Sequence, residues 1–82
     1  MFEIQESGFD TEQGCYFAIA TMYDGERCLV RFNAFEPRNF RIQHQSTSLD
    51  QETILEIGEK MTKEVFRTHI NPAMRKKGGT NA

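Results

Sequence analysis

The chain has 82 residues and a formal net charge of −2, with a sequence pI near 5.6. This length suffices for one domain and leaves no room for a second hydrophobic core. The slightly acidic balance argues against nucleic-acid binding that depends on bulk positive charge, although residues 1–36 carry seven acids and two bases whereas residues 37–82 carry five acids and eight bases.

The N-terminal segment alternates apolar and polar residues over positions 2–5, which predicts a short strand with Phe2 and Ile4 facing inward. Residues 6–14 are rich in turn-forming residues and are interpreted as a loop. Phe9 is the one large apolar residue of this loop, so we expect it to pack back against the edge of the core.

Asp24-Gly25 is the strongest local signal in the chain, because it lies between two runs that can pair across it. Asp-Gly is typical of two-residue hairpin loops, where a type I′ turn needs positive φ at both central residues. The sequence therefore predicts a hairpin over residues 15–23 and 26–33.

The register of this hairpin decides which side chains face the core. A two-residue loop gives the inner face these pairs: Phe17 with Phe32, Ile19 with Val30, Thr21 with Cys28, and Tyr23 with Glu26. The outer face then carries Tyr16 with Asn33, Ala18 with Arg31, Ala20 with Leu29, and Met22 with Arg27. A slip of one residue would exchange the faces and bury the arginines, so we expect this register.

A further strand is predicted after Pro37, with Phe40, Ile42 and His44 on its inner side. Proline cannot donate a ladder hydrogen bond, so Pro37 is expected before the strand and not within it. A short connection to the hairpin makes a meander the economical topology.

An amphipathic helix is predicted to follow, with Asp50 as its N-cap or, alternatively, a capping box of Ser48 and Gln51. Its apolar stripe recurs at helical spacing and comprises Ile54, Ile57, Met61 and Val65, widened by Leu55 and Phe66. The helix is expected to end at Asn71-Pro72, because the residue before a proline avoids the helical region.

Together these elements predict an α+β fold: a small two-layer domain in which an antiparallel, three- or four-stranded meander carries one C-terminal helix on one sheet face. Residues 1–72 would form this domain, and residues 73–82 would form a flexible basic C-terminal tail. The second sheet face is left to water or to a partner.

That second face is the candidate binding surface, since interface cores favour tyrosine, arginine and methionine. The predicted protein-binding residues are Tyr16, Met22, Arg27, Leu29, Arg31, Arg41 and Gln43. We hypothesise a non-enzymatic interaction module, such as an adaptor, inhibitor or regulator, that docks through this face or through a strand edge. An exposed edge strand would also allow a homodimer with one continuous sheet.

The alternative hypothesis is binding of single-stranded nucleic acid, because guanidinium and aromatic planes stack on bases. The residues for this role are Tyr16, Arg27, Arg31 and Arg41, assisted by Lys76 and Lys77. One tyrosine on an acidic chain makes this the weaker hypothesis.

Catalysis is not expected, because the chain lacks a glycine-rich phosphate loop, Gly-x-Ser-x-Gly and His-Glu-x-x-His. Its histidines and cysteines (His44, His69, Cys15 and Cys28) are not at metal-ligand spacing, so neither a metal nor a cofactor is expected. The cysteines lie too far apart along the predicted hairpin for a disulfide. With no leader and no membrane-spanning run, these features favour a reducing, cytoplasmic location.

Overall fold

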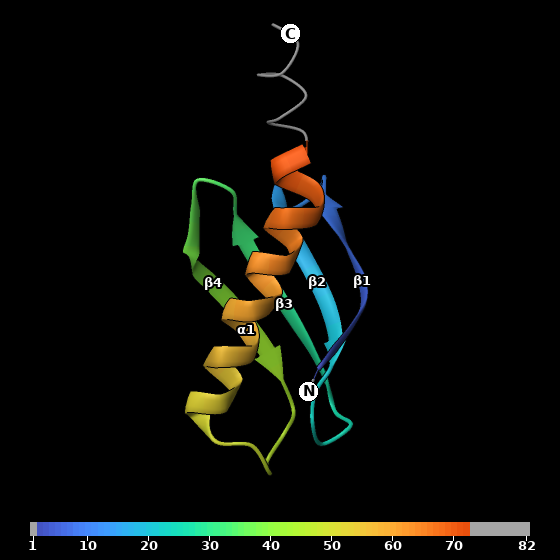
Figure 1. Ribbon diagram of the computed structural model, residues 1–82, viewed down its shortest axis with the longest axis vertical. Coiled ribbons are helices and arrows are strands. Elements are labelled where there is room, and N and C mark those ends of the chain that lie inside the picture. The colour runs from blue at the N-terminus through green and yellow to red at the C-terminus, as the bar shows by residue number, and fades with distance from the viewer. Residues whose placement is uncertain (1, 73–82) are drawn as a thin grey trace, which may run out of the picture.

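The computed structural model describes residues 2–72, which form four strands followed by one helical segment (Figure 1). The strands are β1 (Glu3–Asp10), β2 (Cys15–Thr21), β3 (Arg27–Asn33) and β4 (Glu36–His44). Helix α1 spans Gln51–Val65 and continues as a π-helical turn, η1, over Phe66–Ile70. The predicted basic tail, with Lys76 and Lys77, lies outside the described residues.

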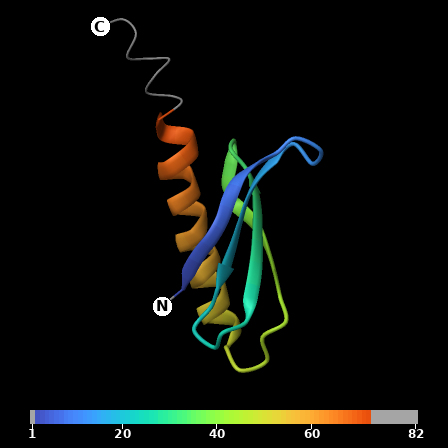
Figure 2. The same cartoon turned by 90° about the vertical axis from the view of Figure 1, so that its right-hand side faces the viewer.

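The four strands form one antiparallel sheet in the order β1-β2-β3-β4, so each strand pairs with its neighbour in sequence. Helix α1 lies across one face of this sheet, and no helix among residues 2–72 covers the opposite face (Figure 2). The predicted two-layer α+β meander is therefore confirmed, with four strands.

The core lies between α1 and the covered sheet face. Ala18 and Ala20 of β2 are fully buried there, and their small side chains leave space for the helix. The predicted stripe of α1 is buried as expected: Ile54, Ile57, Met61 and Val65. Leu55 is 46% exposed, so its predicted place on the stripe is wrong.

The register predicted for the β2–β3 hairpin is wrong by one residue. Ala18 pairs with Val30 and Ile19 pairs with Leu29, whereas the sequence predicted that Ile19 would face Val30. β3 keeps its predicted orientation, because Val30 is buried. The side chains of β2 are therefore the ones that exchange faces.

The geometry of the turn explains this shift. Gly25 has a φ of 86°, but no described residue other than glycine has positive φ, so Asp24 does not adopt the conformation that a type I′ turn requires. Met22 N–H donates to the carbonyl of Glu26 at 2.8 Å, which leaves a three-residue loop of Tyr23, Asp24 and Gly25. This arrangement, with glycine in the left-handed region at the third position, is the usual alternative for hairpins.

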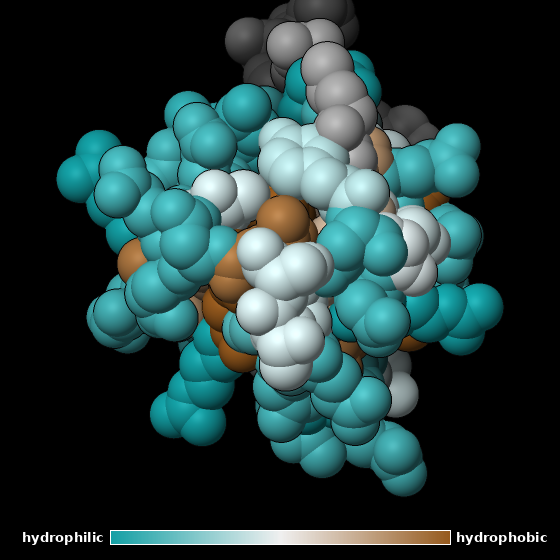
Figure 3. Space-filling model, turned by 90° about the horizontal axis from the view of Figure 1, so that it is seen from below, coloured by the Kyte–Doolittle hydropathy of each residue, from teal (hydrophilic) through white to brown (hydrophobic). Residues whose placement is uncertain are grey.

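Asp24 instead anchors the turn to the segment that leads into α1. Its Oδ1 accepts a hydrogen bond from the backbone N–H of Glu26, while its Oδ2 accepts from the hydroxyls of Ser46 at 2.5 Å and Ser48 at 2.8 Å. These bonds hold the pKa of Asp24 below its ordinary value of 3.8, with the Ser46 hydroxyl as the largest cause. The turn and the segment lie together at the end of the molecule seen in Figure 3, where hydrophilic residues surround a small hydrophobic area.

Two strand boundaries also differ from the prediction. β1 extends to Asp10 through the segment predicted as a loop, with a register shift between Ile4 and Glu6. β4 begins at Glu36 and so contains Pro37, which the sequence placed before the strand. Because β4 is an edge strand, the missing N–H of Pro37 removes no bond that a central strand would need.

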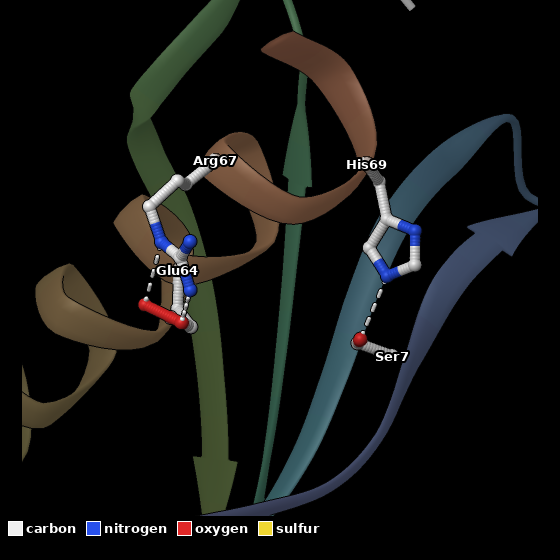
Figure 4. Close-up of polar contacts among 4 residues, drawn as sticks. All are labelled: Ser7, Glu64, Arg67 and His69. Carbon is white, nitrogen blue, oxygen red and sulfur yellow. Dashed lines mark hydrogen bonds and ion pairs between the residues drawn. The ribbon is translucent and has the colours of Figure 1, made fainter. Parts of the chain in front are cut away.

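The C-terminal end of the helical segment is fastened to β1. The backbone remains helical at Asn71, where φ is −58° and ψ is −44°, so the residue before Pro72 does not leave the helical region as the sequence predicted. In the π turn, Asn71 N–H bonds to the carbonyl of Phe66. Figure 4 shows that His69 of this turn reaches Ser7 of β1, with 2.8 Å between Nε2 and the hydroxyl oxygen. The contact joins residues 62 positions apart.

Candidate functional site

The sheet face opposite α1, called the open face below, carries a small apolar centre. It consists of Phe17 and Ile19 on β2 and Leu29 on β3, all half-buried. Ile19 and Leu29 are cross-strand partners, and the ring of Phe17 leans towards β1, since a Cβ atom added at Gly8 would lie 3.6 Å from its Cε1. An apolar centre with a polar surround is the arrangement typical of interface cores.

Three arginines border the β3 side of this centre and are called the basic strip: Arg27 and Arg31 lie on either side of Leu29 along β3, and Arg41 lies on β4. Arg31 and Arg41 are direct cross-strand partners, and like charges in that position destabilise a sheet. The Nε atom of Arg31 is buried and has no hydrogen-bond partner among the described residues. A buried donor without an acceptor is costly in free energy, and the two neighbouring guanidiniums have no ion-pair partner among residues 2–72.

Two acids lie on the opposite side of the apolar centre and are called the acidic strip: Glu3 and Glu6 on β1. Both are exposed, and each shares the open face with its partner on β2, Thr21 for Glu3 and Ile19 for Glu6. The open face thus passes from negative through apolar to positive as it crosses from β1 to β4. Within residues 2–72, the ion pairs are Lys63–Glu59 and Arg67–Glu64, both on the helical segment, so neither strip is neutralised there.

The open face also contains two shallow depressions. A depression of about 310 Å³ is lined by Cys15, Leu29, Arg31, Arg41 and Gln43 among others. A broader one of about 850 Å³ begins on the other side of Leu29 and includes Ile19 and Arg27. Leu29 and Gln43 line both depressions, so side chains of a partner could enter on either side of them.

Most of the predicted protein-binding residues lie together on this face. Arg27, Leu29, Arg31, Arg41 and Gln43 occupy the open sides of β3 and β4, as the sequence predicted.

Tyr16 and Met22 do not lie there, so the place on the open face that the sequence predicted for them is wrong. Met22 is 3% exposed in the core, and Tyr16 packs against the core between Phe9 and Phe32, with ring centroids 5.0 and 5.8 Å away. Both follow β2 to the helix side because of the one-residue shift.

Phe17 and Ile19 take the places of these two residues, and the sequence prediction missed them. Both sides of β2 are apolar in the sequence, so alternation alone did not decide which side faces the core. The usable signal was residue size, because Ala18 and Ala20 suit a surface that lies directly under a helix, whereas a phenylalanine and an isoleucine do not.

The reactive side chains do not form a catalytic arrangement among the described residues. Cys28 is buried with its Sγ 3.5 Å from Sδ of Met61, and burial raises the pKa of its thiol, so it stays protonated at neutral pH. His44 uses Nδ1 to accept the N–H of Ser46. Within residues 2–72 no carboxylate is hydrogen-bonded to the imidazole of the Ser7–His69 pair, and the pair joins strand to helix, which is a structural role.

Within residues 2–72, no cluster of three or more potential ligands could hold a metal ion. No helix of that part of the chain has the length and apolar character to span a bilayer. No protein-family model matches the chain, and neither a curated protein nor a solved structure matches it.

Proposed function

We propose that the protein is a non-enzymatic interaction module that binds a protein partner through its open face. The observation that carries this proposal is the Arg31–Arg41 pair beside the apolar centre, where like charges are direct neighbours and the buried Nε of Arg31 has no acceptor within residues 2–72. Charge-assisted bonds to a carboxylate would satisfy these guanidiniums, and Leu29 would contribute apolar contact area next to them.

The free thiols of Cys15 and Cys28 support a reducing compartment such as the cytoplasm as the place of action. In such a compartment an adaptor, inhibitor or regulator would carry out its function by binding alone. Identification of the partner then defines the process in which the protein takes part.

Site-specific photo-cross-linking tests this proposal. A photoreactive phenylalanine analogue is introduced at Leu29, and a matched control carries it at Leu55, which is 46% exposed on the opposite side of the molecule. After irradiation in a nuclease-treated lysate of the source cells, we expect a protein adduct from position 29 and none from position 55. Equal adducts from both positions, or none from position 29, would refute the open face as a binding site.

Binding of single-stranded nucleic acid is the second candidate function, and one observation favours it. Phe17 lies directly opposite Arg31 on the open face, so an aromatic ring and a guanidinium are adjacent there. Phe17 thus takes the role that the sequence predicted for Tyr16, which lies on the helix side. The acidic strip on the same face weighs against it, because a phosphate backbone crossing the sheet would meet Glu3 and Glu6. Titration of labelled oligonucleotides at about 50 mM salt decides this point, since the hypothesis requires binding that weakens steeply as salt is raised.

A further inference from the structure

The open face is complementary to itself. Its acidic strip lies on β1, its basic strip on β3 and β4, and its apolar centre between them. We infer that the partner of the open face is a second copy of this chain, packed face to face with the two helices on the outside. This inference rests on the proposed function and names the partner that the open face binds.

The charges select one symmetry for this dimer. A two-fold axis parallel to the strands turns β1 of one copy over β4 of the other, so acidic and basic strips meet twice. A two-fold axis across the strands would place β1 over β1 and oppose like charges, which disfavours that arrangement. The favoured axis also gives the aligned packing that two twisted sheets adopt in sandwiches.

The positions of the two strips along the strands allow the acidic strip of one copy to contact the basic strip of the other. Glu6 is on the row of Ile19 and Leu29, and Arg41 is on the next open-face row, beside Arg31. Two rows on one face are about 7 Å apart along a strand, a distance that a glutamate and an arginine side chain span together. A carboxylate from Glu6 of the second copy would then offset the like charges of the Arg31–Arg41 pair, with exposed Arg41 as its first contact.

The size of the open face sets the expected affinity. Four strands of about seven residues cover roughly 19 by 23 Å, so two copies would bury on the order of 1,000 Å². This area is at the lower end for specific interfaces, and the dimer is expected to dissociate in the micromolar range.

The sheet edges are poorer places for a second copy. β1 has a register shift between Ile4 and Glu6, and β4 carries Pro37 and Arg38 near its start. Irregular pairing, charge and proline are the features that keep edge strands from pairing with another chain. The edge-paired homodimer that the sequence suggested is therefore not the arrangement proposed.

Charge reversal of each strip tests the inference by sedimentation equilibrium of the full chain. We expect the wild type to dimerise at tens of micromolar. Its dissociation constant should rise about tenfold when salt rises from 50 to 500 mM, because the charges at the rim of the interface are screened. The basic-strip variant, Arg31→Glu with Arg41→Glu, should stay monomeric up to about 500 µM. The acidic-strip variant, Glu3→Arg with Glu6→Arg, should do the same, and its two sites are exposed, so its fold is not at risk.

Mixing the two variants provides the sharpest result. One variant then has acids along both sides of its open face and the other has bases, so an equimolar mixture should form a heterodimer that neither forms alone. A control variant, Lys60→Glu with Lys63→Glu on the exposed side of α1, has the same charge change as the basic-strip variant and should dimerise like the wild type. Circular dichroism of each variant serves as the control for folding.

The outcomes separate the two claims. A wild type that is monomeric at about 500 µM, charge-reversed variants that still dimerise, or a mixture that does not associate would each overturn the second-copy inference. If any of these occurs while Leu29 cross-links to a different protein, the proposed function stands with another partner. If the open face cross-links to no protein and binds only oligonucleotides, both claims fail.

Discussion

Gly58 of α1 lies directly against the ring of Phe40 on β4, and its replacement by alanine should destabilise the protein even though alanine favours helices. Gly58 is buried within α1. A Cβ atom built on it would lie 2.5 Å from Cε1 of Phe40 and 3.1 Å from Cδ1 and Cζ of that ring. Carbon atoms prefer a separation of about 3.5–4.0 Å, so the ring or the helix must move by roughly 1 Å.

The magnitude follows from two opposing effects. Alanine in place of glycine within a helix stabilises by about 1 kcal/mol, whereas overpacking a filled contact costs about 1–3 kcal/mol. We expect Gly58→Ala to lower the free energy of unfolding by about 1 kcal/mol. In a Phe40→Ala background the obstructing ring is gone, so the same change should raise the free energy of unfolding by about 1 kcal/mol.

Urea denaturation of the wild type, the two single variants and the double variant measures this reversal of sign. The unfolding midpoints, multiplied by a common m-value, give the four free energies and a coupling of about 2 kcal/mol between the two sites. If Gly58→Ala stabilised the protein equally in both backgrounds, the ring of Phe40 would not lie against the helix, and the docking of α1 on β4 would be wrong.

Three further predictions concern the turn, the thiols and the exchanged faces. Asp24→Asn should lower the melting temperature at pH 7. Because the pKa of Asp24 is depressed in the folded state, the carboxylate stabilises the fold above its ordinary pKa of 3.8, and this stabilisation is lost as the pH falls through the lowered pKa. The melting curves of the wild type and the variant should therefore converge in acid. A maleimide reagent should modify Cys15 in the native protein but Cys28 only after unfolding, because Cys28 is 3% exposed; equal rates would place both thiols at the surface. Tyr16→Ala should cost about 3 kcal/mol of stability, whereas Phe17→Ala should cost about 1 kcal/mol or less and weaken self-association instead, as unfolding and sedimentation measured on both variants would show. A larger loss of stability for Phe17→Ala than for Tyr16→Ala would indicate that Tyr16 lies on the open face.

The helix and the general architecture were predictable because their signals are redundant. Asp50 caps α1 as expected, with its Oδ1 accepting from Thr53 N–H at 2.9 Å. Four apolar residues at helical spacing then leave only one side of the helix that can be buried. The helical conformation of Asn71 was not predictable, because the sequence gives no indication that a π turn over Phe66–Ile70 carries helical backbone to the residue before the proline.

The hairpin shows how one residue can alter a predicted site. The Asp24-Gly25 signal correctly located the turn, but Asp24 uses its carboxylate to bind Ser46 and Ser48, which lie 22 and 24 residues away. A contact of that range is not visible in a local pattern. Since β2 is apolar on both sides, alternation did not correct the register, and the small size of Ala18 and Ala20 was the remaining signal.

The arginines of the candidate site were predicted correctly in spite of this error, because the side of β3 that faces the core is clear from its sequence. Arg27 and Arg31 alternate with Cys28 and Val30, so only one side of the strand can be buried whatever the register. The self-complementary charge pattern could not be found from the sequence, because Glu6 was predicted to lie in a loop. It became visible once β1 was known to pair with β2 along its length.

Cross-strand nuclear Overhauser effects between β2 and β3 test the composition of the open face most directly. The account predicts contacts between Ala18 and Val30 and between Ile19 and Leu29. Contacts between Ile19 and Val30 instead would return Phe17 and Ile19 to the core. The apolar centre would then be lost, and with it the proposed binding surface.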